Sequence, residues 1–302
     1  MHSVRGGPFS AERSLHPVVE RNLKARYHLD WPLWKQYLQY VGPLNLDDRG
    51  PELLGGDGTQ PFTGVLAGDL GPSFKYRDYT VNEIIAQSLP ISVALGAVAM
   101  LFAICLGISA GILSALYRGG TVDLAMRLVA TAGIALPNFV IAGILILAFV
   151  FGAHLFPVAG WGTLRHLVLP GLALGAPFAA YISRLTRTGM LEVLSQDHIR
   201  TAHAKGLPPR LVLLRHAIKG GLLPVVTYLG PATAGILTGS LVIEKIFAIP
   251  GTGSHFVNSA LNRDYTLAMG VTILYTVLVY ALNLVVDLAY TLLDPRIDLE
   301  KG

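Results

Sequence analysis

The residues best suited to chemistry lie in positions 192–224, EVLSQDHIRTAHAKGLPPRLVLLRHAIKGGLLP. His198, His203 and His216 are the histidines of this segment. No two of them are at positions i and i+4 and no cysteine accompanies them, so their spacing does not indicate a metal site. The three histidines are better explained as polar residues on the surface of this loop.

The sequence also contains no motif for nucleotide binding or for nucleophilic catalysis. Gly251–Ser254 lacks both the spacing and the lysine of a phosphate-binding loop. No nucleophile elbow holds a serine for acyl transfer. The sequence therefore predicts a chain that is not an enzyme and carries no cofactor of its own.

The same segment has the start and stop signals of a short helix. Ser195 or Asp197 can cap its N-terminus, Gly206 fits the C′ position, and Pro208 and Pro209 prevent its continuation. A rigid, basic helix between two membrane spans can present a surface to a partner. The alternative is an ordinary solvated loop.

The elements that hold this segment are membrane spans. The chain has 302 residues, of which 52% are hydrophobic and 14% charged, well below the charged share of soluble domains. Long uncharged runs approach the ~20 residues that cross a bilayer. We predict an all-α polytopic membrane protein with five transmembrane helices, near 91–113, 134–152, 167–186, 222–247 and 267–291.

Basic residues predict the orientation. Segments 118–127, 184–219 and the tail from Asp294 hold eleven Lys/Arg, whereas loops 153–166 and 244–264 hold three. The positive-inside rule therefore places the C-terminus and the loop 187–219, which contains the short basic helix, in the cytoplasm. The net charge of +4 reflects this topology and implies no nucleic-acid partner.

Residues 1–88 are then expected outside, as an extracytoplasmic loop or small helical lid before the transmembrane domain of 89–302. They are polar and balanced, with nine Lys/Arg and ten Asp/Glu, and carry no signal peptide. We expect that a first membrane helix is missing, through a misassigned start or a shortened chain. Apolar spacing predicts helices on either side of Pro32, and Thr80 or Asn82 is expected to cap the first span.

Five collinear stretches resemble a known family, the transmembrane subunits of the oligopeptide/dipeptide branch of bacterial ABC importers. They are GDLGPSFKYRDYTVNEII (68–85), DHIRTAHAKGLPPRLVLLRHAIKGGLLPVV (197–226), GSLVIEKIFAIPGTG (239–253), ALNRDY (260–265) and VDLAYTLLDPRI (286–297). Six membrane helices are expected in that family. Arg5–Pro8 resembles a remnant of the element that follows the family's first helix.

The resemblance implies a role for the basic helix. In the family, a cytoplasmic loop of the form E-A-A-x-x-x-G seats a coupling helix in a groove of the ATPase. Gly206 matches the glycine, and Arg200 replaces the acid. The usual I-x-L-P falls on His216–Lys219 and is not reproduced. The ATPase-coupling residues expected are Ile199, Arg200, Thr201, Ala202, His203, Lys205, Gly206 and Leu207, with Ile199 and Leu207 as apolar anchors.

The family also implies partners: a second related permease, two ATPase subunits or domains that bind ATP and Mg, an extracytoplasmic substrate-binding protein and the inner-membrane lipid. Peptides are the implied cargo, with nickel or glutathione as alternatives. Expected binding-protein contacts are Phe74, Tyr76, Tyr79, Arg263 and Asp264, although packing within a small lid would also explain the aromatic residues.

Few polar residues lie in the predicted spans. Glu244, Gly235 and Asn138 are candidates for the pathway or its gating, and helix contacts, kinks or an interfacial position are the alternatives. An ion-coupled secondary transporter would need mid-membrane carboxylates and an inverted repeat. Neither pattern is evident, so this class is kept only as the alternative.

Overall fold

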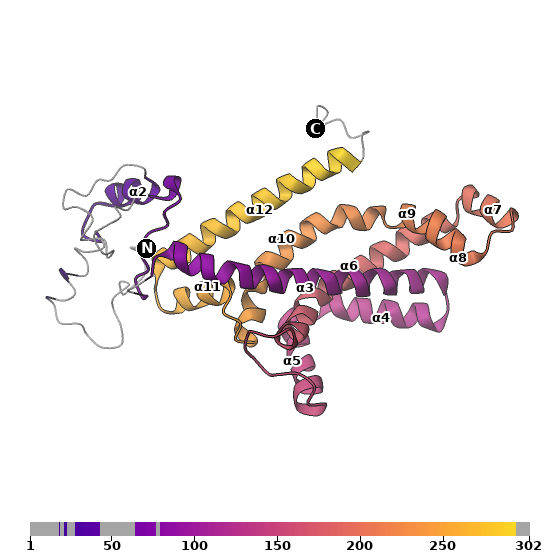
Figure 1. The fold of residues 1–302 in the computed structure, drawn as a ribbon, viewed down its shortest axis with the longest axis horizontal. Helices are drawn as coiled ribbons and strands as arrows, with labels where there is room; N and C mark the ends of the chain where they lie inside the picture. Colours follow the sequence, from indigo (N-terminus) through magenta and orange to yellow (C-terminus); the bar gives the residue numbers. More distant parts are fainter. Residues whose placement is uncertain (1–17, 19–20, 23–27, 43–63, 77–78, 294–302) are drawn as a thin grey trace. The chain divides into compact units, whose positions relative to one another are not determined.

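The computed structural model describes residues 18, 21–22, 28–42, 64–76 and 79–293. Across these ranges the secondary structure is helical, apart from an isolated bridge between Pro72 and Thr80 (Figure 1). The all-α fold class is therefore confirmed. The helix expected just before Pro32 lies mostly outside the described residues, and the one after it is α2 (Leu33–Val41).

Three helices have the length and composition of a membrane span: α3 (Val81–Leu116), α6 (Arg165–Leu194) and α12 (Tyr265–Leu293). Two further candidates are bent pairs. One joins α4 (Thr121–Ala135) to α5 (Asn138–Leu145) and the π-helical η3 (Ile146–Gly152), with a bend of 114°. The described chain thus holds three candidate spans, or up to five if each bent pair is one span.

The second bent pair runs from Pro209 to Leu237, with a bend of 50°. It contains α8 (Pro209–Val212), the π-helical η4 (Leu213–Ala217), α9 (Ile218–Gly221) and the first part of α10 (Leu223–Ile246). His216–Lys219, where the family pattern is not reproduced, therefore lies across the junction of η4 and α9.

The stretch expected as one span near 134–152 is divided by Pro137. Leu136, before the proline, is extended (φ −85°, ψ 131°) and ends α4, while Pro137 caps α5. A residue that precedes proline avoids the helical region, and proline fits the start of a helix because its missing N–H is not needed there. The helix before the bend also begins earlier than expected, at Thr121.

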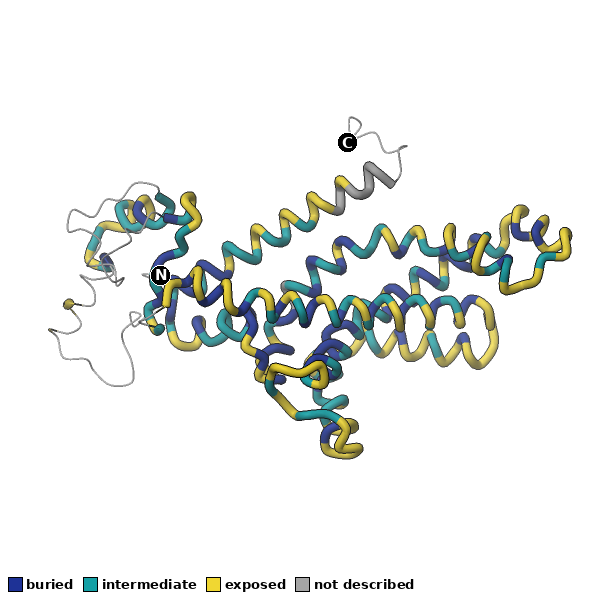
Figure 2. The backbone as a smooth tube through the Cα atoms, in the orientation of Figure 1, coloured by how far each residue is buried: buried dark blue, intermediate teal, exposed yellow. Residues whose placement is uncertain are grey.

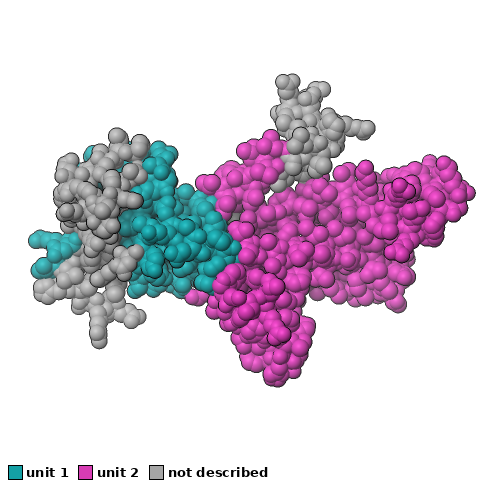
Figure 3. All heavy atoms as spheres, in the orientation of Figure 1, with its two compact units in different colours: residues 1–91, 250–276 teal, residues 92–249, 277–302 magenta. Residues whose placement is uncertain are grey.

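The chain divides into two compact units, coloured in Figure 3. Unit 1 combines residues 1–91 with 250–276, and unit 2 combines 92–249 with 277–302. The expected boundary after residue 88 lies close to the first of these divisions. Segment 250–276 joins the N-terminal unit because its side chains complete that unit's core and hydrogen bonds.

Unit 1 is organised around the start of α3. Thr80 and Glu83 form a reciprocal capping box: Glu83 N–H donates to Thr80 Oγ1 (3.2 Å) and Thr80 N–H donates to Glu83 Oε2 (2.8 Å). The expected cap at Thr80 is thus confirmed. The first turn of α3 buries Val81 against Leu267 and Val271. Two short elements complete this unit, η2 (Val65–Ala67) and α11 (Thr252–Leu261).

Unit 2 depends on close helix packing through small residues. A Cβ atom at Gly107 would lie 2.6 Å from the carbonyl oxygen of Ala179, and one at Gly175 would lie 2.4 Å from that of Ala99. Glycine is therefore required where α3 crosses α6, as expected for small residues in membrane helices. Figure 2 shows the buried positions along α6, whereas the described part of α12 is mostly exposed or half-buried.

Candidate functional site

The basic loop folds into the short helix that its punctuation predicted, α7 (Asp197–Ala204). Gly206 follows with φ 76°, the left-handed conformation that glycine adopts without a steric penalty. The expected side-chain cap is wrong: Gln196 occupies the N-cap position and makes no capping bond. Ser195 instead donates its hydroxyl to the Glu192 carbonyl, which belongs to the preceding helix.

The two faces of α7 differ sharply. Ile199 is 2% exposed and Ala202 is 5% exposed. The other residues predicted to couple to an ATPase are exposed, apart from half-buried Leu207. The exposed ones are Arg200, Thr201, His203, Lys205 and Gly206. The helix therefore has one apolar face that packs on its own chain and one polar face that is open.

The buried face packs into a cluster that we name the α7 seat. It comprises Ala115, Met190, Val193, Ile199, Ala202, Val212 and Ala217, with Leu207 packed beside it. These residues come from the ends of α3 and α6, from α7, and from α8 and η4. The apolar anchor predicted for a partner is thus used within the chain, and α7 is fixed to α6.

A partly buried ion pair lies nearby. Asp123 on α4 is 1% exposed, and Arg187 on α6 donates to both of its oxygens, from Nε to Oδ1 at 2.8 Å and from Nη2 to Oδ2 at 3.0 Å. The Ser114 hydroxyl donates to Oδ1 (2.6 Å) and the Gly119 N–H to Oδ2 (2.9 Å). Sequence reasoning missed this group and counted its arginine only as a topological charge. The one available signal in the sequence was the acidic residue Asp123 in the first turn of a largely apolar helix.

Glu244 on α10 is also fully buried. Its Oε1 accepts hydrogen bonds from the Ser92 hydroxyl of α3 (2.8 Å) and the Ser240 hydroxyl one turn earlier (2.7 Å). The carboxyl group therefore joins α3 to α10 through polar bonds in an apolar surrounding, where satisfied polar groups lock a helix contact.

The other two pathway candidates are Gly235 on α10 and Asn138 on α5. Gly235 is nine residues before Glu244 on the same helix, which places it about 180° around the axis. A Cβ atom there would lie 3.1 Å from Phe178. Asn138 is the first residue of α5, directly after the proline bend. Gly235 and Glu244 therefore face opposite sides of α10.

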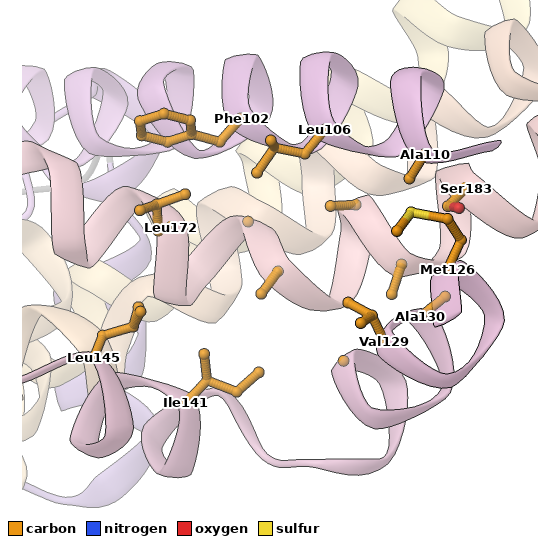
Figure 4. A pocket seen from close by; sticks show the side chains of 15 residues that line it. Phe102, Leu106, Ala110, Met126, Val129, Ala130, Ile141, Leu145, Leu172 and Ser183 are labelled. Atoms are coloured by element: carbon orange, nitrogen blue, oxygen red, sulfur yellow. The ribbon is translucent and has the colours of Figure 1, made fainter. Parts of the chain in front are cut away.

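An apolar cavity of about 240 Å³ lies elsewhere in unit 2, between α3, α4, α5 and α6. Figure 4 shows Phe102 and Leu106 of α3 over one side, with Met126 and Val129 of α4 and Ile141 of α5 around the other. Ser183 supplies the hydroxyl in this lining. None of the three pathway candidates lines the cavity.

Unit 1 brings together the two segments expected to bind an external protein. Asp264 is buried, and it accepts hydrogen bonds from the Ser73 hydroxyl and from the backbone N–H groups of Phe74 (3.1 Å) and Lys75 (3.2 Å). Tyr79 is exposed, and Tyr76 contacts His255 edge-on. The carboxylate of Asp264 thus points inward and positions the loop that carries the aromatic residues.

Arg263, the remaining member of this set, is half-buried and has a left-handed backbone (φ 58°) at the end of α11. Among the described residues, no group of three or more His, Cys, Asp or Glu could hold a metal ion.

Comparisons with known proteins agree with this architecture. The fold is similar to the inward-facing MetNI methionine ABC transporter, with a TM-score of 0.57 and 16% identity over 68% of this chain and 93% of that chain. It is also similar to an amino acid ABC transporter solved with histidines, with a TM-score of 0.54 and 14% identity over 68% of this chain and 92% of that one. These similarities establish a shared fold.

Sequence relatives are closer. The oligopeptide transport system permease protein OppB of Escherichia coli (strain K12) is 44% identical over 299 residues, which cover 98% of this chain and 91% of that protein. The dipeptide transport system permease protein DppB of Bacillus subtilis (strain 168) is 44% identical over 301 residues, 100% of this chain and 91% of that protein. A family profile described as "Binding-protein-dependent transport system inner membrane component" matches residues 107–299. The chain therefore belongs to this family of inner membrane components, as an ABC permease subunit.

Proposed function

We propose that this chain is a transmembrane subunit of an ATP-driven importer of oligopeptides or dipeptides. The near-full-length similarity to OppB and DppB supports peptides as the cargo. Nickel and glutathione remain the alternative cargoes for a permease of this type. Selectivity in such a machine rests mainly with an extracytoplasmic binding protein.

The two-faced α7 helix is the observation that carries the coupling role. Its buried Ile199 and Ala202 fix it to the chain's own core, while Arg200, His203 and Lys205 remain open to pair with acidic groups of an ATPase. A push on the open face is therefore delivered to α6 through the α7 seat. A solvated loop that merely obeys the positive-inside rule would not need this buried face.

The proposed assembly contains a second related permease and two ATPase subunits or domains, which bind ATP and Mg and supply all the hydrolysis. In this arrangement α7 and the C-terminus face the cytoplasm, and unit 1 faces the outside of the inner membrane. The loaded binding protein docks on unit 1, where Tyr79 and Arg263 are accessible and Asp264 holds their loops in place. Glu244, Gly235 and Asn138 remain candidates for the pathway or its gating.

A charge reversal tests the coupling surface. Arg200→Glu with Lys205→Glu should abolish co-purification of the ATPase and peptide uptake in reconstituted vesicles, because both side chains are exposed on or beside α7. Arg215→Glu with Lys219→Glu is the matched control, since it reverses two exposed charges of the same loop outside α7. Surface substitutions of this kind usually change stability by less than about 0.5 kcal/mol.

Substitution of Gly206 tests the backbone geometry at the C-terminal end of α7, with Gly68 as the control. Gly206→Ala should reduce peptide-stimulated ATP hydrolysis, whereas Gly68→Ala should not, although the two residues have similar φ angles (76° and 82°) and open space around them. Normal coupling in both the charge-reversed and the Gly206 variants would disprove docking through α7. Uptake driven by an ion gradient without ATP would instead identify a secondary transporter.

A further inference from the structure

The Asp123–Arg187 pair is built more completely than an ordinary surface ion pair. Four hydrogen bonds converge on the two oxygens of the Asp123 carboxylate, two from Arg187 and one each from Ser114 and Gly119. The two bonds from the guanidinium fix the orientation of α4 against α6 as well as their separation. We name this group the Asp123–Arg187 clamp.

The clamp lies between the coupling helix and the apolar cavity. Arg187 precedes Met190, a member of the α7 seat, by less than one helical turn. In the other direction along α6, Ala180 lies against α4 again, because a Cβ atom at Gly133 would be 3.0 Å from that of Ala180. The two helices run antiparallel and are in contact at two places, Asp123 with Arg187 and Gly133 with Ala180. These contacts are about 10 to 15 Å apart along the helix axes.

We propose that α4 and α6 move as one rigid body when α7 is displaced, and that Asp123 and Arg187 are the positioning residues that keep them in register. This inference rests on the proposed coupling function of α7. Part of the cavity lining then stays fixed. Met126 and Val129 on α4 keep their distance from Ala179 and Ser183 on α6, which follow Pro177 in the proline-free part of that helix.

Charge neutralisation tests the clamp. Arg187→Gln and Asp123→Asn should each lower the peptide transported per ATP hydrolysed by about tenfold, a typical strength for coupling between sites. Arg127→Gln is the matched control: its Nε lies 3.5 Å from the same Asp123 oxygen, but its side chain is 52% exposed. The control should transport normally. The ratio of transport to hydrolysis is measured at equal amounts of membrane-inserted protein.

A disulfide cross-link between α4 and α6 distinguishes a loss of their relative positioning from a loss of protein stability. In a Cys105→Ser background, Gly133→Cys and Ala180→Cys place two thiols on the facing helices, and a shift of about 0.5 Å reaches disulfide spacing. Oxidation should leave transport unchanged in the chain with an intact clamp, because the two helices do not separate. It should also restore transport to the Arg187→Gln variant, which a merely destabilised protein would not recover.

The outcomes distinguish this inference from the proposed function. If the unmodified chain gives no ATP-dependent peptide uptake with its partners, the proposed function fails. If uptake is normal and oxidation of the cross-link blocks it, α4 and α6 must separate during transport and the rigid-body inference is wrong. Normal coupling in both Arg187→Gln and Asp123→Asn would also overturn it.

Discussion

The Ile199→Ala substitution should detach α7 from the rest of the chain without unfolding the membrane helices. Ile199 is 2% exposed in the α7 seat. Truncation of a buried isoleucine to alanine costs about 2 to 5 kcal/mol. Because α7 has eight residues, too few to be stable alone in water, this loss acts first on its attachment. Even about 2 kcal/mol would raise the detached population about 30-fold.

Limited trypsin cleavage after Lys205 measures this population, provided that the helix opens and closes faster than it is cut. We expect the initial rate to rise about 30-fold in detergent-solubilised Ile199→Ala, with little change in the unfolding temperature of the whole chain. His198→Ala, at the exposed neighbouring position, is the control and should be cleaved as slowly as the unmodified protein. Equal cleavage of the two variants would show that Ile199 does not hold α7.

Two further predictions concern unit 1. Asp264→Ala should speed amide hydrogen exchange at residues 73–76, because each donor left unsatisfied costs about 1 to 3 kcal/mol. Lys75→Ala keeps the backbone bond and should not speed exchange, and equal exchange in both variants would contradict the role of the carboxylate. Burial lowers the pKa of His255 below its ordinary value, so the unfolded chain binds more protons between the two pKa values and stability is lost as pH falls below about 6.5. Exchange protection of α11 followed from pH 7 to pH 5 should therefore fall in the unmodified chain but less in His255→Phe, and identical profiles would refute this.

Local signals predicted two helix boundaries, although the side-chain cap expected for α7 was wrong. Gly206 followed by Pro208 indicated where α7 ends, and Thr80 indicated where α3 begins, since caps and stops depend on neighbouring residues. The direction in which Ile199 points was not predictable. An apolar residue on an eight-residue helix can face its own chain or a partner, and only the fold decides between them.

Long-range pairs could not be predicted from one sequence. Asp123 and Arg187 are 64 positions apart, and Ser73 is 191 positions from Asp264. Charge counting assigned such arginines to a side of the membrane but gave them no partners. The break at Pro137 was recognisable, yet its 114° angle depends on the packing of α4 and α5 against α6.

Helix α6 is not equally stiff along its length. Its two internal prolines, Pro170 and Pro177, each remove a backbone hydrogen bond in the first half. The stretch from Phe178 to Leu194 contains no proline, spans about 25 Å and leads directly into α7. On the coupling role proposed for α7, a displacement of that helix acts directly on this proline-free stretch, which transmits it with little bending.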